Sequence, residues 1–196
     1  MGWKRAVRKR QSALRRRQIY PPSPPNQRRI YRPKKRPAAR ETNSGSIAGM
    51  ADSVPSIDLF AHTDCDDLDF EWLTAKAREA LPHCLKSVGS AETVLPMLEE
   101  VEVSFVSDKA IAEVHGCFMD DPTPTDVITF HHGEILVSVD TARQEGPKHG
   151  HDSQKETLLY IIHGLLHLNG HTDLVESDRE AMHHCQEWIL ELVTAN

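Results

Sequence analysis

The chain consists of two segments of opposite charge. Residues 1–50 contain 15 of the 23 Lys and Arg residues but a single acidic residue, Glu41, so their formal net charge is +14. Residues 51–196 contain 8 basic and 28 acidic residues, which gives −20. A segment as basic as the first, with few large apolar side chains, cannot collapse into a core. We therefore expect the folded part of the chain to lie in residues 51–196.

The basic segment, residues 1–50, is predicted to be a disordered tail. It holds six of the twelve prolines, and burial cannot offset the entropy of ordering it. Three explanations of the tail remain open: an arm that binds nucleic acid, an Arg-rich organellar presequence, or an extension that is not translated because Met50 is the true start. The second segment has the length of one domain with its own core.

Several classes of protein are excluded by what the sequence lacks. Its apolar runs are a handful of residues long, whereas a transmembrane helix needs about 20. No apolar stretch of ~7–15 residues follows the basic N-terminus, as a signal peptide would require. The four cysteines form no C-x-x-C pair, which is typical of free thiols in a reducing compartment. We expect a cytoplasmic protein that does not associate with a membrane.

Alternating helical and extended patterns predict an α+β fold in which helices pack on a small sheet. Apolar residues recur at three- and four-residue steps along Phe70–Lys86, as in an amphipathic helix. Residues 101–105 alternate with period two, as in a strand, and Ser107 is a candidate N-cap for a short helix after it. The other predicted elements are strands at Val127–Phe130 and 135–139, a helix beginning at 140–144, and two helices in 153–192 that are separated near Gly170.

A candidate metal-binding helix lies near the C-terminus. His163 and His167 are four residues apart, so on a helix their rings share one face and can bind one metal ion. The surrounding Leu and Ile residues predict a buried helix, in which an unpaired polar ring would cost roughly a few kcal/mol. The two histidines could instead pair with backbone or carboxylate groups, but the apolar context favours a metal ion.

Two residues are candidates for a third ligand. Gly170 suits a left-handed helix cap that turns the chain back toward the two rings. Beyond it, His171 offers an imidazole and Asp173 a carboxylate oxygen, and zinc accepts either. The spacing alone does not decide between them.

Two motifs resemble a known family. Residues 163–170, His-Gly-Leu-Leu-His-Leu-Asn-Gly, followed by a donor at position 173, resemble the signature of the YbeY-type metal-dependent endoribonucleases, the bacterial rRNA-maturation factors. Residues 124–130, Pro-Thr-Asp-Val-Ile-Thr-Phe, with Gly-Glu-Ile at 133–135, are similar to two strands of that family. The resemblance covers about residues 92–190 and implies that 51–196 form a single metal-dependent hydrolase domain with a small mixed sheet.

The resemblance also implies a function and a site. The function is zinc-dependent hydrolysis of single-stranded RNA in rRNA maturation and ribosome quality control, with ribosomal proteins or the ribosome as partners and no role for DNA. The implied ligands of one zinc ion are His163, His167 and Asp173. The family's third ligand is usually histidine, so the carboxylate leaves another divalent ion open. Met119 stands where the family commonly has an arginine that is suspected of contacting phosphate.

The chemistry of such a site leaves some roles open. A metal ion with an open position can polarise a phosphodiester and deliver hydroxide to phosphorus. His171 is a candidate proton carrier, since histidine titrates near neutral pH, but a solvated turn residue explains it equally well. A ribosome-assembly or RNA-binding factor with a structural zinc is the non-enzymatic alternative, and a fourth ligand such as His171 or His115 would favour it. A metallopeptidase of the H-E-x-x-H type is disfavoured because Gly164 occupies the glutamate position.

The remaining polar clusters are expected to be structural. We expect an exposed turn at His131 and His132, and no chemistry from His183, His184 and Cys185 on the last helix. Asp126 either supports the site through a hydrogen bond or fixes its own strand. Four acidic residues in 64–69 are expected to form a solvated lead-in to the first helix.

Overall fold

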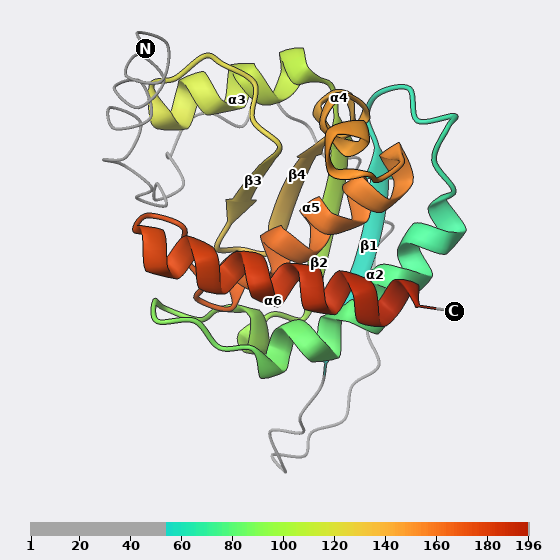
Figure 1. Ribbon diagram of the computed structural model, residues 1–196. Helices are drawn as coiled ribbons and strands as arrows, with labels where there is room; N and C mark the ends of the chain where they lie inside the picture. Colours follow the sequence, from blue (N-terminus) through green and yellow to red (C-terminus); the bar gives the residue numbers. More distant parts are fainter. Residues whose placement is uncertain (1–53, 196) are drawn as a thin grey trace, which may run out of the picture.

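The computed structural model describes residues 54–195, and its centre is a four-stranded sheet (Figure 1). The strand order is β1-β2-β4-β3. The three strands β1, β2 and β4 are parallel to one another, whereas β3 runs antiparallel to β4. The strand bounds are Ser56–Ala61 for β1, Glu100–Val106 for β2, Val127–Phe130 for β3 and Glu134–Ser138 for β4. The predicted α+β fold with a small mixed sheet is thus confirmed; the basic tail and Met50 lie outside the described residues.

Helices cover both faces of this sheet. The helix bounds are Phe70–Lys86 for α2, Leu95–Met97 for the short 3-10 helix η2, Asp108–Met119 for α3, Val139–His149 for α4, Ser153–Leu168 for α5 and Glu176–Thr194 for α6. Ile135 and Val137 of β4 enter a large core shared with α2, α4, α5 and α6. Leu136 between them enters a smaller core with Ile111 of α3. The period-two alternation of β4 therefore separates the two layers.

Helix α5 is the central helix of the large core. It contacts β3, β4, α2, α4 and α6, and Figure 1 shows α6 crossing in front of it. Its close approach to the sheet depends on Gly164, because a Cβ there would lie 2.7 Å from Cγ2 of Ile135. Since α5 is buried along nearly its whole length, its two histidines are held between the sheet and α6.

Most helices begin at a side-chain cap, as the sequence pattern of α3 indicated. The Ser107 hydroxyl accepts a hydrogen bond from the backbone N–H of Ala110, and Asp152 does the same for Lys155 at the start of α5. Asp69 caps α2 and Ser138 caps α4 in the same way. Each cap satisfies a backbone donor that the helix leaves unpaired.

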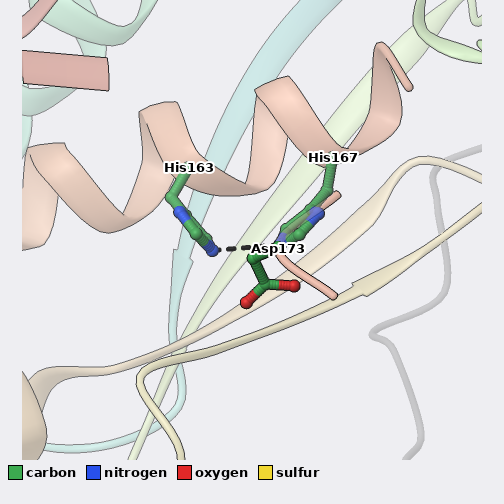
Figure 2. Close-up of side chains that lie close together, drawn as sticks. All are labelled: His163, His167 and Asp173. Atoms are coloured by element: carbon green, nitrogen blue, oxygen red, sulfur yellow. Dashed lines mark hydrogen bonds between the residues drawn. The ribbon is translucent and has the colours of Figure 1, made fainter. Parts of the chain in front are cut away.

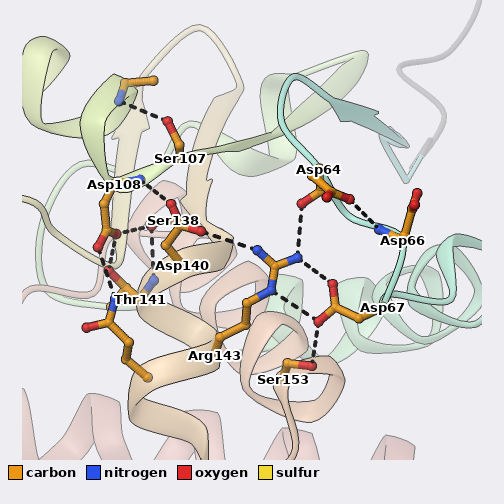
Figure 3. Close-up of polar contacts among 12 residues, drawn as sticks. Asp64, Asp66, Asp67, Ser107, Asp108, Ser138, Asp140, Thr141, Arg143 and Ser153 are labelled. Carbon is orange, nitrogen blue, oxygen red and sulfur yellow. Dashed lines mark hydrogen bonds and ion pairs between the residues drawn. The ribbon is translucent and has the colours of Figure 1, made fainter.

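A polar network ties together the segments that follow the three parallel strands (Figure 3). Arg143 of α4 binds Asp67 with its guanidinium group and donates to Asp140 at 3.2 Å and to the carbonyl of Asp64 at 3.0 Å. Asp108 accepts hydrogen bonds from the hydroxyls of Ser138 and Thr141. The acidic stretch 64–69 is therefore more than a solvated lead-in: Asp67 pairs with Arg143 and Asp69 caps α2.

Candidate metal centre

His163 and His167 face each other on one side of α5 (Figure 2). Their Nε2 atoms are 2.9 Å apart, and the ring planes are perpendicular. The four-residue spacing on a helix produces this juxtaposition, as the sequence predicted. His167 is 5% exposed and His163 is half-buried.

The far side of each ring binds an oxygen atom that fixes its orientation. Nδ1 of His163 lies 2.8 Å from Oε1 of Gln186 on α6, and Nδ1 of His167 lies 3.0 Å from the carbonyl oxygen of His171. Because both partners are acceptors, each Nδ1 carries a proton, and in the neutral form of a ring the lone pair of Nε2 points toward the other ring. Two lone pairs at 2.9 Å repel each other unless a cation lies between or beside them.

Asp173 supplies a third donor to the same point. Its carboxylate and the two imidazoles form the group in residues 54–195 whose donor atoms all lie within 4.8 Å of one another. Oδ1 of Asp173 is buried and accepts no hydrogen bond. A buried carboxylate oxygen without a partner is costly, so the donor set of two imidazoles and one carboxylate fits a divalent metal ion.

Burial lowers the pKa of His167 in this pair. The pKa of His167 falls to about 4, first because the ring is buried and second because His163 lies beside it; the Asp173 carboxylate opposes this effect. His167 is therefore neutral at pH 7, which is the form that binds a metal ion.

The turn that carries Asp173 is fixed by backbone contacts with the segment after α2. Gly170 adopts a left-handed conformation with a φ of 85°, as its predicted cap requires. A Cβ on Gly89 would overlap the backbone of Gly170, so only glycine allows this approach. The amide of Asn169, which is fully buried, donates to the carbonyls of Cys84 and Ser87 at 2.8 and 2.7 Å.

The ring of His171 points away from this donor group. Its Nε2 lies 3.1 Å from the carbonyl oxygen and 3.2 Å from Oγ of Ser87, and burial lowers its pKa. Its backbone carbonyl, not its ring, contacts His167. His115 lies elsewhere and binds the carbonyl of Thr123. In the described part of the chain, neither histidine joins the group of three donors.

A cavity of about 240 Å³ opens beside the three donors. One wall comes from α6, through Arg179, Met182, His183 and Gln186. His183, from which no chemistry is expected, lies on this wall. The 3-4-7 spacing of these four residues indicates one helix face, but that spacing does not reveal which element the face meets.

The opposite wall comes from the segment that enters β3. Thr125, Asp126 and Val127 line it, and Oδ1 of Asp126 accepts hydrogen bonds from the N–H of Val127 at 2.9 Å and the hydroxyl of Thr125 at 3.0 Å. Asp126 thus fixes its own strand entry and also borders the cavity. Met119, the last residue of α3, does not line the cavity, and His132 lies in the β3–β4 turn, where it contacts Glu134.

The sheet is small, mixed and covered by helices, and two histidines and an aspartate converge beside a cavity. These features define an α+β domain with a candidate metal centre. The chain belongs to the endoribonuclease YbeY family, whose family model matches residues 62–194. The family that the two sequence motifs indicated is therefore confirmed.

Curated relatives carry the name of the same family. Endoribonuclease YbeY of Protochlamydia amoebophila is 40% identical over 91 residues, which cover 41% of this chain and 61% of that protein. Endoribonuclease YbeY of a Synechococcus species is 37% identical over 95 residues, which cover 41% of this chain and 59% of that protein. The chain thus spans about three fifths of these two relatives. The Halalkalibacterium halodurans relative is 29% identical over 154 residues, 68% of this chain and 92% of that protein.

A solved structure is also similar to part of the chain. The solution structure of TM1509 from Thermotoga maritima covers 70% of this chain and 88% of its own, with 25% identity and a TM-score of 0.47.

In the described residues, no helix combines the length and the apolar character needed to cross a membrane.

Proposed function

We propose that the chain is a metal-dependent endoribonuclease that hydrolyses single-stranded RNA during rRNA maturation and ribosome quality control. Membership of the endoribonuclease YbeY family supports the reaction class. The observation that carries the proposal is the pair of Nε2 atoms that face each other at 2.9 Å, with the unpartnered Oδ1 of Asp173 beside them.

His163, His167 and Asp173 would hold the ion, which we propose to be zinc. When bound, zinc acts as a Lewis acid and makes a water molecule acidic enough to attack a phosphodiester at neutral pH. Gln186 and the His171 carbonyl keep both rings in the tautomer that exposes Nε2. The carboxylate lowers the net charge of the site compared with three imidazoles, so another divalent ion is the first alternative to test.

A catalytic role is favoured over a purely structural metal by the number of donors. Structural zinc sites in proteins almost always have four protein ligands. In residues 54–195, three donors meet beside a cavity that has room for further ligands of the ion. The ring of His171, a candidate fourth ligand and proton carrier, is instead bound to Ser87. We therefore assign His171 to positioning His167 through its carbonyl.

The same geometry gives no support to a peptidase. Peptidases of the H-E-x-x-H type need a glutamate beside the first histidine. Gly164 occupies that position, and the space beside it is filled by Ile135. No carboxylate can therefore be placed there without moving α5 from the sheet.

We also propose the setting in which the protein acts. Residues 51–196 would form a single hydrolase domain, with single-stranded rRNA precursors as substrate, the ribosome or its proteins as partners, and no part for DNA. A cytoplasmic location is supported by the four free cysteines, of which Cys65 and Cys84 are buried.

Cleavage of a labelled single-stranded RNA by the full-length protein tests the function. We expect zinc-loaded protein to cut it, chelation to stop the reaction, and added zinc to restore it. His167→Ala should abolish both cleavage and zinc binding, whereas His115→Ala, which alters a histidine remote from the donors, should retain both. Cleavage by the His167→Ala protein after chelation would remove the metal from the mechanism.

A further inference from the structure

One face of α6 forms a wall of the cavity beside the three donors. Arg179, Met182, His183 and Gln186 follow the 3-4-7 spacing that places side chains on one side of a helix. Gln186 is already committed to Nδ1 of His163, at 2.8 Å. Arg179 therefore lies two turns away from a residue that touches a donor, on the same face.

Among the described residues that line this cavity, one is a lysine or arginine, and that residue is Arg179. The other permanent charges on the walls are the carboxylates of Asp126 and Asp173. Residues 51–196 as a whole carry 28 acidic against 8 basic residues. A polyanion that approaches this cavity is repelled unless a cation compensates each phosphate locally.

The guanidinium group of Arg179 is held by a partner that a phosphate can replace. It forms an ion pair with Glu176, one turn earlier on α6, whose side chain is 65% exposed, whereas the Arg179 side chain is 34% exposed. Such solvent-exposed ion pairs contribute little net stability. The phosphodiester of RNA carries one negative charge, as the carboxylate does, and can bind the planar guanidinium group through two oxygens in the same bidentate way.

We propose that Arg179 is a phosphate-binding residue of the RNA site: it exchanges Glu176 for a phosphate of the RNA that lies in the cavity beside the three donors. This inference rests on the proposed function, since it takes RNA as the ligand. It assigns the recognition of the backbone charge to α6 and leaves the two histidines and Asp173 to the metal ion. Glu176 then competes with RNA for the same guanidinium group.

Binding of a non-cleavable probe tests this assignment separately from catalysis. The probe is a fluorescent single-stranded 2′-O-methyl RNA, shown to be intact on a gel after the measurement, and the protein is the zinc-loaded full-length chain. We expect Arg179→Gln to raise Kd about tenfold or more, as for a lost charge-assisted pair of hydrogen bonds. The slope of log K against log salt should fall by about 0.7, the value for one phosphate contact on a single strand.

Arg78→Gln is the matched control. Arg78 also pairs with a carboxylate, that of Asp58, but does not line the cavity, and its replacement changes the net charge equally. We expect its Kd to stay within about twofold of the wild type. Zinc content and the thermal unfolding midpoint of both variants establish that the metal site and the fold are intact.

Removal of the competing carboxylate should act in the opposite direction. Glu176→Gln frees Arg179 and is expected to tighten binding about two- to fivefold. Glu79→Gln removes the same charge from an i, i+3 pair with Lys76 on α2, remote from the cavity, and should change Kd less. Equal effects of the two variants would mean that only the net charge matters and would overturn the competition.

The outcomes separate this inference from the proposed function. If the wild type cuts RNA but Arg179→Gln binds the probe as Arg78→Gln does, the phosphate contact is wrong and the function stands. If Arg179→Gln is the one variant that loses affinity for the probe while the wild type cuts no RNA, the phosphate contact of Arg179 is confirmed and the enzymatic proposal fails. A wild type that binds no probe overturns the contact.

Discussion

Gln186 of α6 accepts a hydrogen bond from Nδ1 of His163 of α5 at 2.8 Å, although 23 residues separate them in the chain. Gln186 is 5% exposed, so this bond is made largely in the protein interior. It decides which nitrogen of His163 carries the proton and hence which one faces His167. The packing of α6 on α5 therefore determines the state of the candidate metal centre.

Replacing Gln186 should weaken metal binding while leaving all three proposed ligands in place. Gln186→Leu removes the acceptor of Nδ1 and is expected to lower zinc affinity about 10- to 100-fold, the usual effect of losing such a support. Gln186→Glu keeps an acceptor and should keep or raise the affinity. Competition with a chromophoric chelator measures both.

Gln144→Leu serves as the control for this measurement. Gln144 is likewise hydrogen-bonded to another side chain, since its amide N–H donates to Asp108, but it lies on α4 away from the cavity. Its zinc affinity should equal that of the wild type. Equal affinities of Gln186→Leu and the wild type would show that the bond to His163 does not tune the site.

The stability of the metal-free protein should depend on pH through His167. Its pKa is about 4 in the folded state and about 6.5 in an unfolded chain, so the unfolded state binds more protons between these values. The free energy of unfolding should therefore fall as the pH drops from about 6.5 to about 4, by up to about 3 kcal/mol from this group. Above about pH 6.5 the contribution of His167 to the free energy of unfolding is fully present.

Urea unfolding of chelated wild type and His167→Gln at several pH values measures this contribution. The difference between their slopes isolates His167, because other groups titrate in both proteins. The hydrogen bond with Arg143 lowers the pKa of Asp67. Burial raises the pKa of Asp108, but the hydrogen bonds from Ser138 and Thr141 together outweigh it, so that pKa is lowered as well. Their contributions are lost below about pH 4 and do not overlap the window. Parallel curves for the two proteins between pH 6.5 and 4 would contradict the assignment.

Local patterns predicted most of the fold. The apolar stripe of α2 gave its bounds, Phe70–Lys86, and the N-cap of α3 was found at Ser107. β1 was missed because it lies at the end of the sheet, where Ile57 alone is fully buried and no alternation is visible. The strand predicted at 135–139 ends one residue early, since Ser138 caps α4 and Val139 begins that helix.

The candidate site was predictable only where its residues are close in sequence. His163, His167 and Asp173 belong to one helix and the turn after it, so periodicity and a turning glycine bring them together. Gln186 and Arg179 come to the site through the packing of α6 on α5, which their own spacing does not specify. Ser87 and Gly89, which hold the turn, are more than 80 residues away from it. The pair Asp67 and Arg143 escaped prediction for the same reason, being 76 residues apart.

Gly164→Ala should loosen the packing of α5 on the sheet. The new methyl group would lie 2.7 Å from Cγ2 of Ile135, so the helix or the strand must move, which typically costs about 1–3 kcal/mol of stability. Zinc affinity should fall as well, because His163 is the preceding residue. Chemical unfolding and chelator competition measure the two effects.

A double-mutant cycle with Ile135→Ala tests the cause of that loss. Ile135→Ala removes the group that the methyl would meet, so the two substitutions together should destabilise less than the sum of the single changes. Additive losses would locate the effect of Gly164→Ala elsewhere.

Glu156 offers a final test, of a buried carboxyl group away from the metal centre. Its carboxylate is fully buried in α5 and contacts Nδ1 of His149 at 2.9 Å and Nδ1 of His151 at 2.8 Å. Glu156→Leu leaves both imidazoles without their acceptor at the junction of α4 and α5, which should cost about 2–4 kcal/mol, whereas Glu156→Gln keeps one acceptor and should cost about half as much. The two histidines differ in exposure, 53% for His149 and 11% for His151, so His149→Ala should cost under about 1 kcal/mol and His151→Ala more. Urea unfolding of the four variants orders these losses, and equal losses for the two histidines would mean that burial does not set the strength of these contacts.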